Sequence, residues 1–249
     1  MLSVERVSKI FNPKRSNAVV ALSDVSLQIK QGEFVTIIGT NGSGKSTLLN
    51  LIAGSLFPSS GRIIWNNQEI TRMPEHQRSR WLTRVFQNPL AGTAPDLSIL
   101  DNFRLAAMRS RSKKLIIGTN AAFQQKVGDQ VSALGLGLEH KLHQPIGMLS
   151  GGQRQALTLL MSVMDGSEMI LLDEPSAALD PRSAQRVLQL AGEIIAQHQL
   201  TALLITHNIK DALQYGTRLI QMGEGRILRD VSPEEKKRLQ PETVFNWFN

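Results

Sequence analysis

"GTNGSGKST", residues Gly39–Thr47, decides the fold, because it matches the pattern G-x-x-x-x-G-K-[ST] without a mismatch. The residues leading into it, "EFVTIIG" (Glu33–Gly39), are continuously apolar, which predicts a strand covered on both faces. The residues after it predict an amphipathic helix that begins at Gly44 and stops at Gly54. A strand, a glycine-rich loop and a helix in this order are the context that a phosphate-binding loop requires. The stretch therefore predicts a nucleoside triphosphate site.

Each residue type in this loop has a chemical reason to be there. The glycines let successive backbone N–H groups turn towards the phosphates, and the helix N-terminus adds partial positive charge. We expect Lys45 to reach the β- and γ-phosphates, Ser46 to bind Mg²⁺ through its hydroxyl, and Thr47 to support the α-phosphate. The predicted nucleotide-binding set is Gly39, Thr40, Asn41, Gly42, Ser43, Gly44, Lys45, Ser46 and Thr47.

A second polar pair follows the apolar strand in "MILLDEP", residues Met169–Pro175. The strand would deliver Asp173 beside the phosphate loop, where its carboxylate can hold Mg²⁺ through water. Glu174 comes next and is placed to orient and polarise an attacking water. By itself, Asp-Glu after a strand is often a solvated turn, but the order of the two motifs favours the functional interpretation.

Two single polar residues also follow predicted strands. Gln87 comes after the short strand "TRVF", and His207 comes after "TALLIT". Ligands collect at the carboxyl ends of strands in open α/β sheets. A lone Gln or His there is usually structural, and only their positions relative to the phosphate loop and Glu174 favour a role in the site.

The rest of the chain predicts an α/β fold in which a mostly parallel sheet has helices on both faces and receives a helical insertion. Within the insertion, Phe123, Val127, Val131 and Leu134 form a helical stripe that we expect to end at a Gly135 C-cap. Asp180 and Pro181 predict the N-cap and first turn of a later helix. Further strands are expected at 25–29 and within 61–70, the latter ending in an Asn-Asn turn. A helix is expected at 208–215 and a hairpin at 218–228. One or two short helices are expected at 232–249, with Phe245, Trp247 and Phe248 packed on the body.

The bulk composition limits the remaining classes. The length of 249 residues suits one large domain or two unequal ones, and no apolar run approaches the ~18 residues of a membrane span. The N-terminus alternates charged and apolar residues, so we expect no signal peptide. Zero cysteines exclude disulfides and thiolate sites, and a net charge of +7 indicates an acidic partner. The basic cluster "RSRSKK" (Arg109–Lys114) is either a solvated segment or a nucleic-acid patch.

One further glycine-rich stretch is not explained by the nucleotide site predicted above. "MLSGGQRQALTLL", residues Met148–Leu160, begins a second glycine-rich helix, yet it holds no base, no nucleophile and no set of metal ligands. It lies about a hundred residues after the phosphate loop.

Taken together, these motifs resemble those of the ATP-binding subunits of ABC (ATP-binding cassette) transporters, and the resemblance covers nearly the whole length. It implies a P-loop NTPase core with a mostly parallel sheet, an N-terminal antiparallel β subdomain and an inserted helical subdomain. The implied ranges within one domain (1–249) are 1–87 and 150–230 for the β subdomain and core, 88–149 for the helical subdomain and 231–249 for a C-terminal helical tail.

The resemblance also explains the second glycine-rich helix start. In this family two subunits meet head to tail, and each ATP lies between one subunit's phosphate loop and the other's signature "LSGGQ", here Leu149–Gln153. Ser150, Gly151, Gly152 and Gln153 would thus bind the ATP of a second copy, through a helix N-terminus. The resemblance further assigns Gln87, which also faces Mg²⁺, and the switch residue His207 to catalysis. It assigns Asp180 of "SAALD" to nucleotide binding, and Phe11 either to adenine stacking or to strand packing.

The resemblance implies an ATPase that drives solute transport through separate permease subunits. We expect import of an amino acid or similar small solute, with a solute-binding protein in the same system and a position on the cytoplasmic face of the inner membrane. The alternatives are the ATPase of an ABC exporter, or an ABC ATPase that acts on nucleic acid. We favour import because "HKLHQPIGM" replaces the acidic segment that precedes the signature in many exporters. We expect no nucleic-acid partner, because the roughly sixty residues between Gln87 and the signature cannot hold a long coiled coil.

Overall fold

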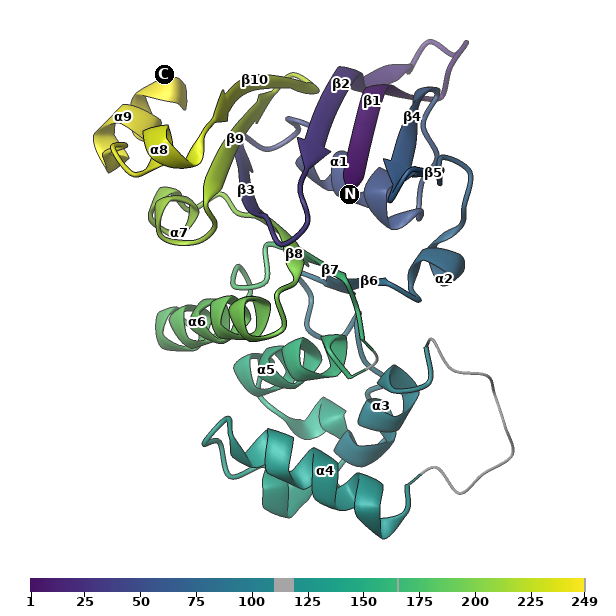
Figure 1. Cartoon of the computed structure of the whole chain (residues 1–249), viewed down its shortest axis with the longest axis vertical. Coiled ribbons are helices and arrows are strands. Elements are labelled where there is room, and N and C mark those ends of the chain that lie inside the picture. Colours follow the sequence, from purple (N-terminus) through teal and green to yellow (C-terminus); the bar gives the residue numbers. More distant parts are fainter. Residues whose placement is uncertain (110–118, 165, 249) are drawn as a thin grey trace. The chain divides into compact units, whose positions relative to one another are not determined.

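The computed structural model describes residues 1–109, 119–164 and 166–248, so the basic cluster after Arg109 lies outside the described residues. By contacts between residues, the chain divides into two compact units. The first unit comprises 1–78, 171–174 and 199–249, and the second comprises 79–170 and 175–198. The first unit therefore combines segments that are distant in the sequence (Figure 1). Within the described residues, no helix is long and apolar enough to cross a membrane.

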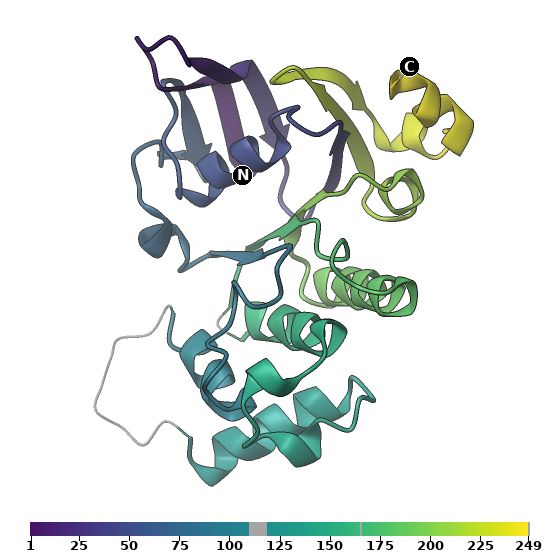
Figure 2. The same ribbon diagram turned by 180° about the vertical axis from the view of Figure 1, so that it is seen from behind.

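The first unit contains an antiparallel sheet with the strand order β2-β1-β4-β5. Its strands are β1 (Leu2–Phe11), β2 (Val19–Ile29), β4 (Ser60–Trp65) and β5 (Gln68–Glu69). Alternate residues at the end of β2 are buried and exposed, as expected of a sheet with one face on the core. The turn between β4 and β5 contains Asn66 and Asn67, both with positive φ. Helix α1 lies behind this sheet in Figure 1 and in front of it in Figure 2.

A second, mostly parallel sheet has the strand order β10-β9-β3-β8-β7-β6. Strand β3 (Phe34–Gly39) pairs in parallel with β8 (Thr201–Ile205) and β9 (Arg218–Gly223), and β10 (Arg226–Val231) forms an antiparallel hairpin with β9. The last three residues of strand β7 (Met169–Asp173) belong to the first unit, and its first two belong to the second. Strand β6 (Leu82–Val85) belongs to the second unit. The apolar run of β3 is buried after Phe34, which confirms the prediction of a covered strand.

Helix α1 (Lys45–Ala53) begins and ends next to glycines with left-handed backbone, Gly44 and Gly54, as the sequence predicts. The last turn of α1 is held by Arg78, a fully buried residue of α2 (Glu75–Arg78). Its Nη1 donates to the carbonyls of Leu51 at 2.8 Å and Ile52 at 2.7 Å. Burial lowers the pKa of Arg78 to about 10. A cation at these carbonyls satisfies acceptors that the helix leaves unpaired, so α1 is held at the end opposite its loop.

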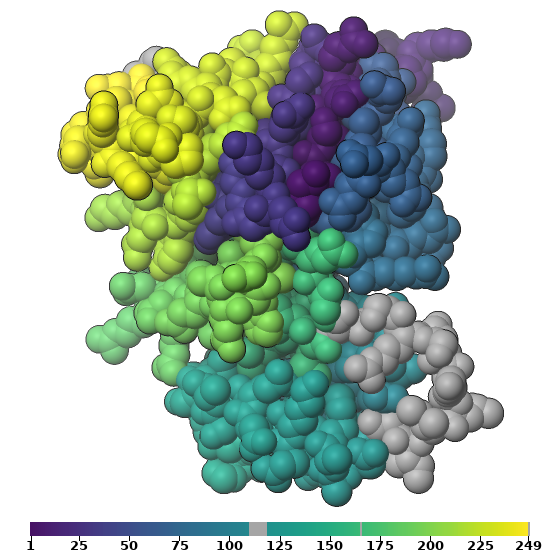
Figure 3. All heavy atoms as spheres, viewed as in Figure 1, coloured from purple at the N-terminus to yellow at the C-terminus, as the bar shows by residue number. Residues whose placement is uncertain are grey.

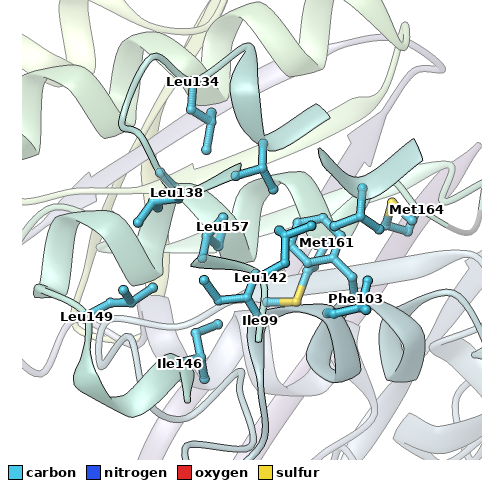
Figure 4. Close-up of a cluster of buried hydrophobic side chains, with 14 of the residues drawn as sticks. Ile99, Phe103, Leu134, Leu138, Leu142, Ile146, Leu149, Leu157, Met161 and Met164 are labelled. Carbon is cyan, nitrogen blue, oxygen red and sulfur yellow. The ribbon is translucent and has the colours of Figure 1, made fainter. Parts of the chain in front are cut away.

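The second unit is built around helices α3 (Ile99–Ala106), α4 (Ala121–Ser132), α5 (Gly151–Ser162) and α6 (Pro181–Gln197), with short turns η1 (Glu139–Lys141) and η2 (Ile146–Met148). Apolar side chains from α3, α4 and α5, among them Val127, meet in one buried cluster. Figure 4 shows Phe103 and Leu157 within it. This cluster explains the helical stripe in the sequence, since three helices can cover one another's apolar faces only by packing together.

Two expectations about local structure are wrong. The stripe helix α4 ends at Ser132 with Ala133 as its C-cap, so Leu134 and the left-handed Gly135 lie beyond the helix. The Gly135 N–H bonds the Ser132 carbonyl at 2.9 Å, which makes the glycine part of a turn that still buries Leu134.

The second error concerns the C-terminal segment, which forms α8 (Pro233–Lys236), α9 (Pro241–Phe245) and η3 (Asn246–Phe248) next to α7 (Ile209–Gln214). Trp247 and Phe248 pack on the core as expected. Phe245 instead is 58% exposed, because its neighbour Val244 occupies the inward position on the short helix.

Candidate nucleotide-binding site

The phosphate loop connects the buried strand β3 to the N-terminus of α1. Its turn needs glycine at two positions, since Gly42 has φ 80° and Gly44 has φ 96°. At Gly44 a Cβ would also lie 2.7 Å from the carbonyl oxygen of Ala21 and 2.7 Å from Leu22 Cδ2. The loop conformation is therefore available to this sequence and not to one with larger residues at these positions.

Lys45 lies across its own loop. Its Nζ donates to the carbonyl of Gly39 at 2.9 Å and to that of Thr40 at 3.0 Å, and the side chain is buried. Burial lowers the pKa of Lys45, while the negative charges of Glu174 and Asp173 oppose that shift. The ammonium is thus the buried cation of the loop, and both predicted acidic residues lie within its electrostatic reach.

Strand β7 ends at Asp173, and Glu174 follows in an unusual backbone conformation. Its φ of 47° lies in the left-handed region, which costs free energy for a residue with a side chain. The Glu174 N–H donates to the carbonyl of Ile205, the last residue of β8, at 3.0 Å. This bond ties the sharp turn to the neighbouring strand and so helps fix the direction of the carboxylate.

The turn brings Glu174 to His207. Glu174 Oε2 lies 3.1 Å from His207 Nδ1, and the Glu174 side chain is 17% exposed while that of His207 is 60% exposed. In the neutral tautomer that donates from Nδ1, the imidazole holds the carboxylate and Nε2 is an acceptor; only the doubly protonated imidazole also donates from Nε2. The sequence predicts both residues for the site but not that they pair, because the pairing depends on the turn at Glu174.

The donor set fits Mg²⁺. Ser46 in the first turn of α1 offers a hydroxyl, and Asp173 offers a carboxylate at the end of β7, both in the first unit. Mg²⁺ commonly uses one or two such protein oxygens together with water and substrate phosphates. Nowhere in the described ranges do three or more His, Cys, Asp or Glu side chains cluster as a metal site would require.

The remaining predicted residues divide between the units. Gln87 is exposed just beyond β6 in the second unit, where Gln155 Nε2 donates to the carbonyl of the preceding Phe86 at 2.9 Å. Phe11 ends β1 in the first unit, half-buried, with Lys9 Nζ 5.2 Å from its ring centroid. Phe11 therefore stays a predicted residue for adenine stacking or for strand packing. Gln87 and the phosphate loop belong to different units, so the role of Gln87 in catalysis and as a Mg²⁺ ligand stays a prediction.

Asp180 is the N-cap of α6, as predicted, and accepts from the N–H groups of Arg182 at 3.2 Å and Ser183 at 3.1 Å. Hydrogen bonds from Ser183 lower the pKa of this carboxyl group. Asp180 therefore has a structural role as the N-cap of α6, and its role in nucleotide binding stays a prediction.

The signature stretch begins α5 with a capping box. Ser150 Oγ accepts from the Gln153 N–H at 3.3 Å, and Gln153 Oε1 accepts from the Ser150 N–H at 3.1 Å. The pattern S-x-x-Q was present in the sequence, but reasoning from the glycines missed it. The backbone N–H groups of Gly151 and Gly152 belong to the first turn, where an α-helix has no acceptors of its own. This helix start can receive an anion.

Gly152 also has a packing role within the second unit. A Cβ at this position would lie 2.8 Å from Ser183 Cβ and 2.9 Å from Ser183 Oγ, at the start of α6. Helices α5 and α6 therefore approach each other closely where the signature begins, a contact that spacing along the chain could not indicate.

We expect Gly152→Ala to lower the free energy of unfolding by about 1–3 kcal/mol, because the added methyl overpacks the contact with Ser183. Gly128→Ala is the matched control, since its Cβ would lie an ordinary 3.8 Å from Leu142 Cδ1 inside α4. This control should stabilise the chain by roughly 0.5–1 kcal/mol through helix propensity. Urea unfolding monitored by circular dichroism measures both, and equal effects of the two variants would contradict the close approach.

Comparisons with known proteins identify the family to which this chain is similar. Residues 22–177 match the family model described as "ABC transporter". The chain is 37% identical over 251 residues to the tyrosine transport ATP-binding protein of Clostridioides difficile strain R20291, covering 100% of this chain and 98% of that protein. It is 34% identical over 238 residues to the phosphonates import ATP-binding protein PhnC of Lactococcus lactis subsp. lactis, covering 94% of each. The solved dimeric, post-hydrolysis ATP-binding cassette MJ0796 bound to ADP and Pi superposes with a TM-score of 0.80 and 27% identity, over 94% of this chain and 99% of that one.

Proposed function

We propose that this chain, which belongs to the ABC transporter family, is the ATP-hydrolysing subunit of a membrane import system. The observation that carries the proposal is the Glu174–His207 pair at 3.1 Å, held in the same unit as the phosphate loop and its buried Lys45. A carboxylate fixed by an imidazole beside a phosphate site is suited to hydrolysis, whereas binding alone does not need it.

The residues divide the work of hydrolysis. The backbone N–H groups of the loop and the Lys45 ammonium hold the phosphates, and the sharp turn aims the Glu174 carboxylate at the attacking water. His207 donates from Nδ1 to Glu174, and in its doubly protonated form it would also donate from Nε2 to the γ-phosphate. Ser46 and Asp173 would hold Mg²⁺, which would supply positive charge for the phosphates.

The signature stretch acts on a second copy of the chain. Ser150 and the first-turn amides of α5 offer an anion site at a helix start, but they sit in the second unit while the phosphate loop sits in the first. Two subunits arranged head to tail complete two sites, each with a loop from one chain and a signature from the other. The dimeric MJ0796 cassettes support this arrangement.

A groove in the second unit is suited to the membrane partner. It has a volume of about 420 Å³ and lies between β6, the segment after Gln87, α3 and α5. Apolar and cationic side chains line it, among them Leu105, Met161, Arg84 and Arg109. We assign this groove to a cytoplasmic helix of a permease subunit, which would bring the permease next to the Gln87 segment.

The variant Leu105→Glu should reduce co-purification of membrane proteins with the tagged chain by at least about tenfold, because a charge replaces an apolar contact in the groove. ATP hydrolysis by the free chain should be unchanged. Leu228→Glu is the control, since Leu228 on β10 is exposed to a similar degree, 55% against 51%. Equal losses for both variants would show a general effect of added charge and would count against the groove.

The most specific part of the proposal is the identity of the transported solute. Relatives of this chain are named for transport of tyrosine, phosphonates, thiamine and spermidine/putrescine. Because the tyrosine transport protein aligns over the full length at 37% identity, we propose import of an amino acid, with a solute-binding protein, at the cytoplasmic face of the inner membrane. Uptake of labelled tyrosine against labelled methylphosphonate, in vesicles containing the chain with its co-purified membrane partners, tests this. Phosphonate uptake without tyrosine uptake would reject the amino acid.

A further inference from the structure

The C-terminal segment and the residues around His207 share a groove, and apart from His207 its lining residues have no role in the mechanism proposed above. It has a volume of about 680 Å³ and lies entirely within the first unit. One wall is the start of α7, with His207 and Lys210, and the other is α9 and the residue after it, with Glu242 and Phe245. Figure 3 shows α8 and α9, in yellow, as part of the molecular surface.

Phe245 places an exposed aromatic side chain at this groove. Its ring is 58% exposed on a helix whose neighbouring Val244 is fully buried, so the helix is firmly seated while the aromatic faces outwards. The Gln221 side chain donates to the Trp247 carbonyl at 3.0 Å, and the Arg229 guanidinium lies 5.0 Å from the Trp247 ring, which fixes the segment further. An aromatic on a fixed support at a surface is typical of an interface residue.

The charges around the groove match a second copy of the same surface. Lys210 on one wall and Glu242 on the other have opposite sign, and both are exposed. In a dimer with two-fold symmetry a patch meets itself, so a residue on one copy faces a different residue on the other. A patch that carries one cation, one anion and an aromatic can therefore pair with its own copy, cation to anion.

The groove is also continuous with the proposed ATP-bound interface. His207, which the proposed mechanism directs at the γ-phosphate side, lines the same groove as Phe245. A second copy that approaches His207 in the closed dimer therefore also approaches α9.

We propose that the groove between α7 and α9 is a dimer contact: in the ATP-bound dimer Phe245 packs against α9 of the second copy, and Lys210 faces the partner subunit's Glu242. The proposal rests on the head-to-tail dimer of the proposed function and adds a contact outside the nucleotide site. The C-terminal segment then stabilises the closed state in which hydrolysis occurs.

Cross-linking tests the contact directly, because the chain contains no cysteine. Phe245→Cys is placed in the Glu174→Gln background, ATP and Mg²⁺ are added, and a short bismaleimide is applied. We expect a covalent dimer that depends on ATP. Leu228→Cys, at an exposed site on β10, is the control and should stay monomeric on a denaturing gel.

Light scattering on the same samples separates this inference from the proposed function. An ATP-dependent dimer without the Phe245→Cys cross-link would overturn the contact and leave the head-to-tail dimer intact. Absence of any ATP-dependent dimer would overturn both.

A charge exchange provides the second test. Lys210→Glu should weaken the ATP-dependent dimer about fivefold, and Lys210→Glu combined with Glu242→Lys should restore it, because each pair is then attractive again. Additive losses in the double variant would overturn the pairing of these two residues.

Discussion

Replacing Glu174 with glutamine should lower the rate of ATP hydrolysis by about 10²–10⁴-fold while ATP still binds. The amide keeps the size of the side chain and can still accept from His207 Nδ1, which lies 3.1 Å from the carboxylate in the native chain. What disappears is the negative charge that polarises the attacking water. The variant should therefore accumulate as an ATP-bound dimer, visible as a shift in size-exclusion chromatography when ATP and Mg²⁺ are present.

The matched control is Glu224→Gln. Glu224 also has left-handed backbone, with φ 49°, but it lies in the β9–β10 hairpin and is exposed. It tests whether loss of a glutamate from a strained turn affects activity by itself. We expect wild-type hydrolysis from this control. Near-normal turnover by Glu174→Gln would remove Glu174 from the role of base and leave its strained turn without a functional explanation.

The fold of the phosphate loop could be predicted because its determinants are local. The apolar run of β3, the glycines that permit φ 80° at Gly42 and 96° at Gly44, and the apolar face of α1 are adjacent in the chain. Parallel strands end at the same edge of a sheet, so Glu174 and His207, which follow the neighbouring strands β7 and β8, could also be expected at one place.

The parts that could not be predicted depend on tertiary geometry. The hydrogen bond between Glu174 and His207 needs the left-handed turn at Glu174 and its N–H bond to Ile205. The close approach of Gly152 to Ser183 follows from how α5 packs on α6. The exposed Phe245 follows from which face of a five-residue helix meets the core, and so short a helix has too little periodicity to decide it.

The close approach at Gly152 also decides how to test the signature stretch. A carboxylate introduced at Gly152 would disturb both a partner's phosphate and the contact with Ser183 in its own chain. Ser150→Asp avoids this, because aspartate caps a helix about as well as serine and adds only the charge. Ser150→Asn is the neutral control with nearly the same shape and capping ability.

Ser150→Asp should reduce ATP hydrolysis by at least about a hundredfold, since a negative charge then faces the γ-phosphate in a closed interface, while Ser150→Asn should retain most of the activity. Lys45→Ala should be similarly inactive, because it removes the buried cation of the phosphate loop. Each inactive chain keeps the element that the other has lost: Lys45→Ala retains Ser150, and Ser150→Asp retains Lys45.

Mixing the two inactive chains should therefore restore activity. A heterodimer has one site that combines native Lys45 with native Ser150 and one site with both defects, so it should reach at most about half of the wild-type rate. Hydrolysis is measured as phosphate release at increasing ratios of one chain to the other, with each chain alone as the baseline. A rate that peaks at equal amounts requires that the site be shared between chains. Full activity of the Ser150→Asp chain alone would mean that the start of α5 at Ser150 does not bind a phosphate. The capping box of Ser150 would then serve only to begin the helix.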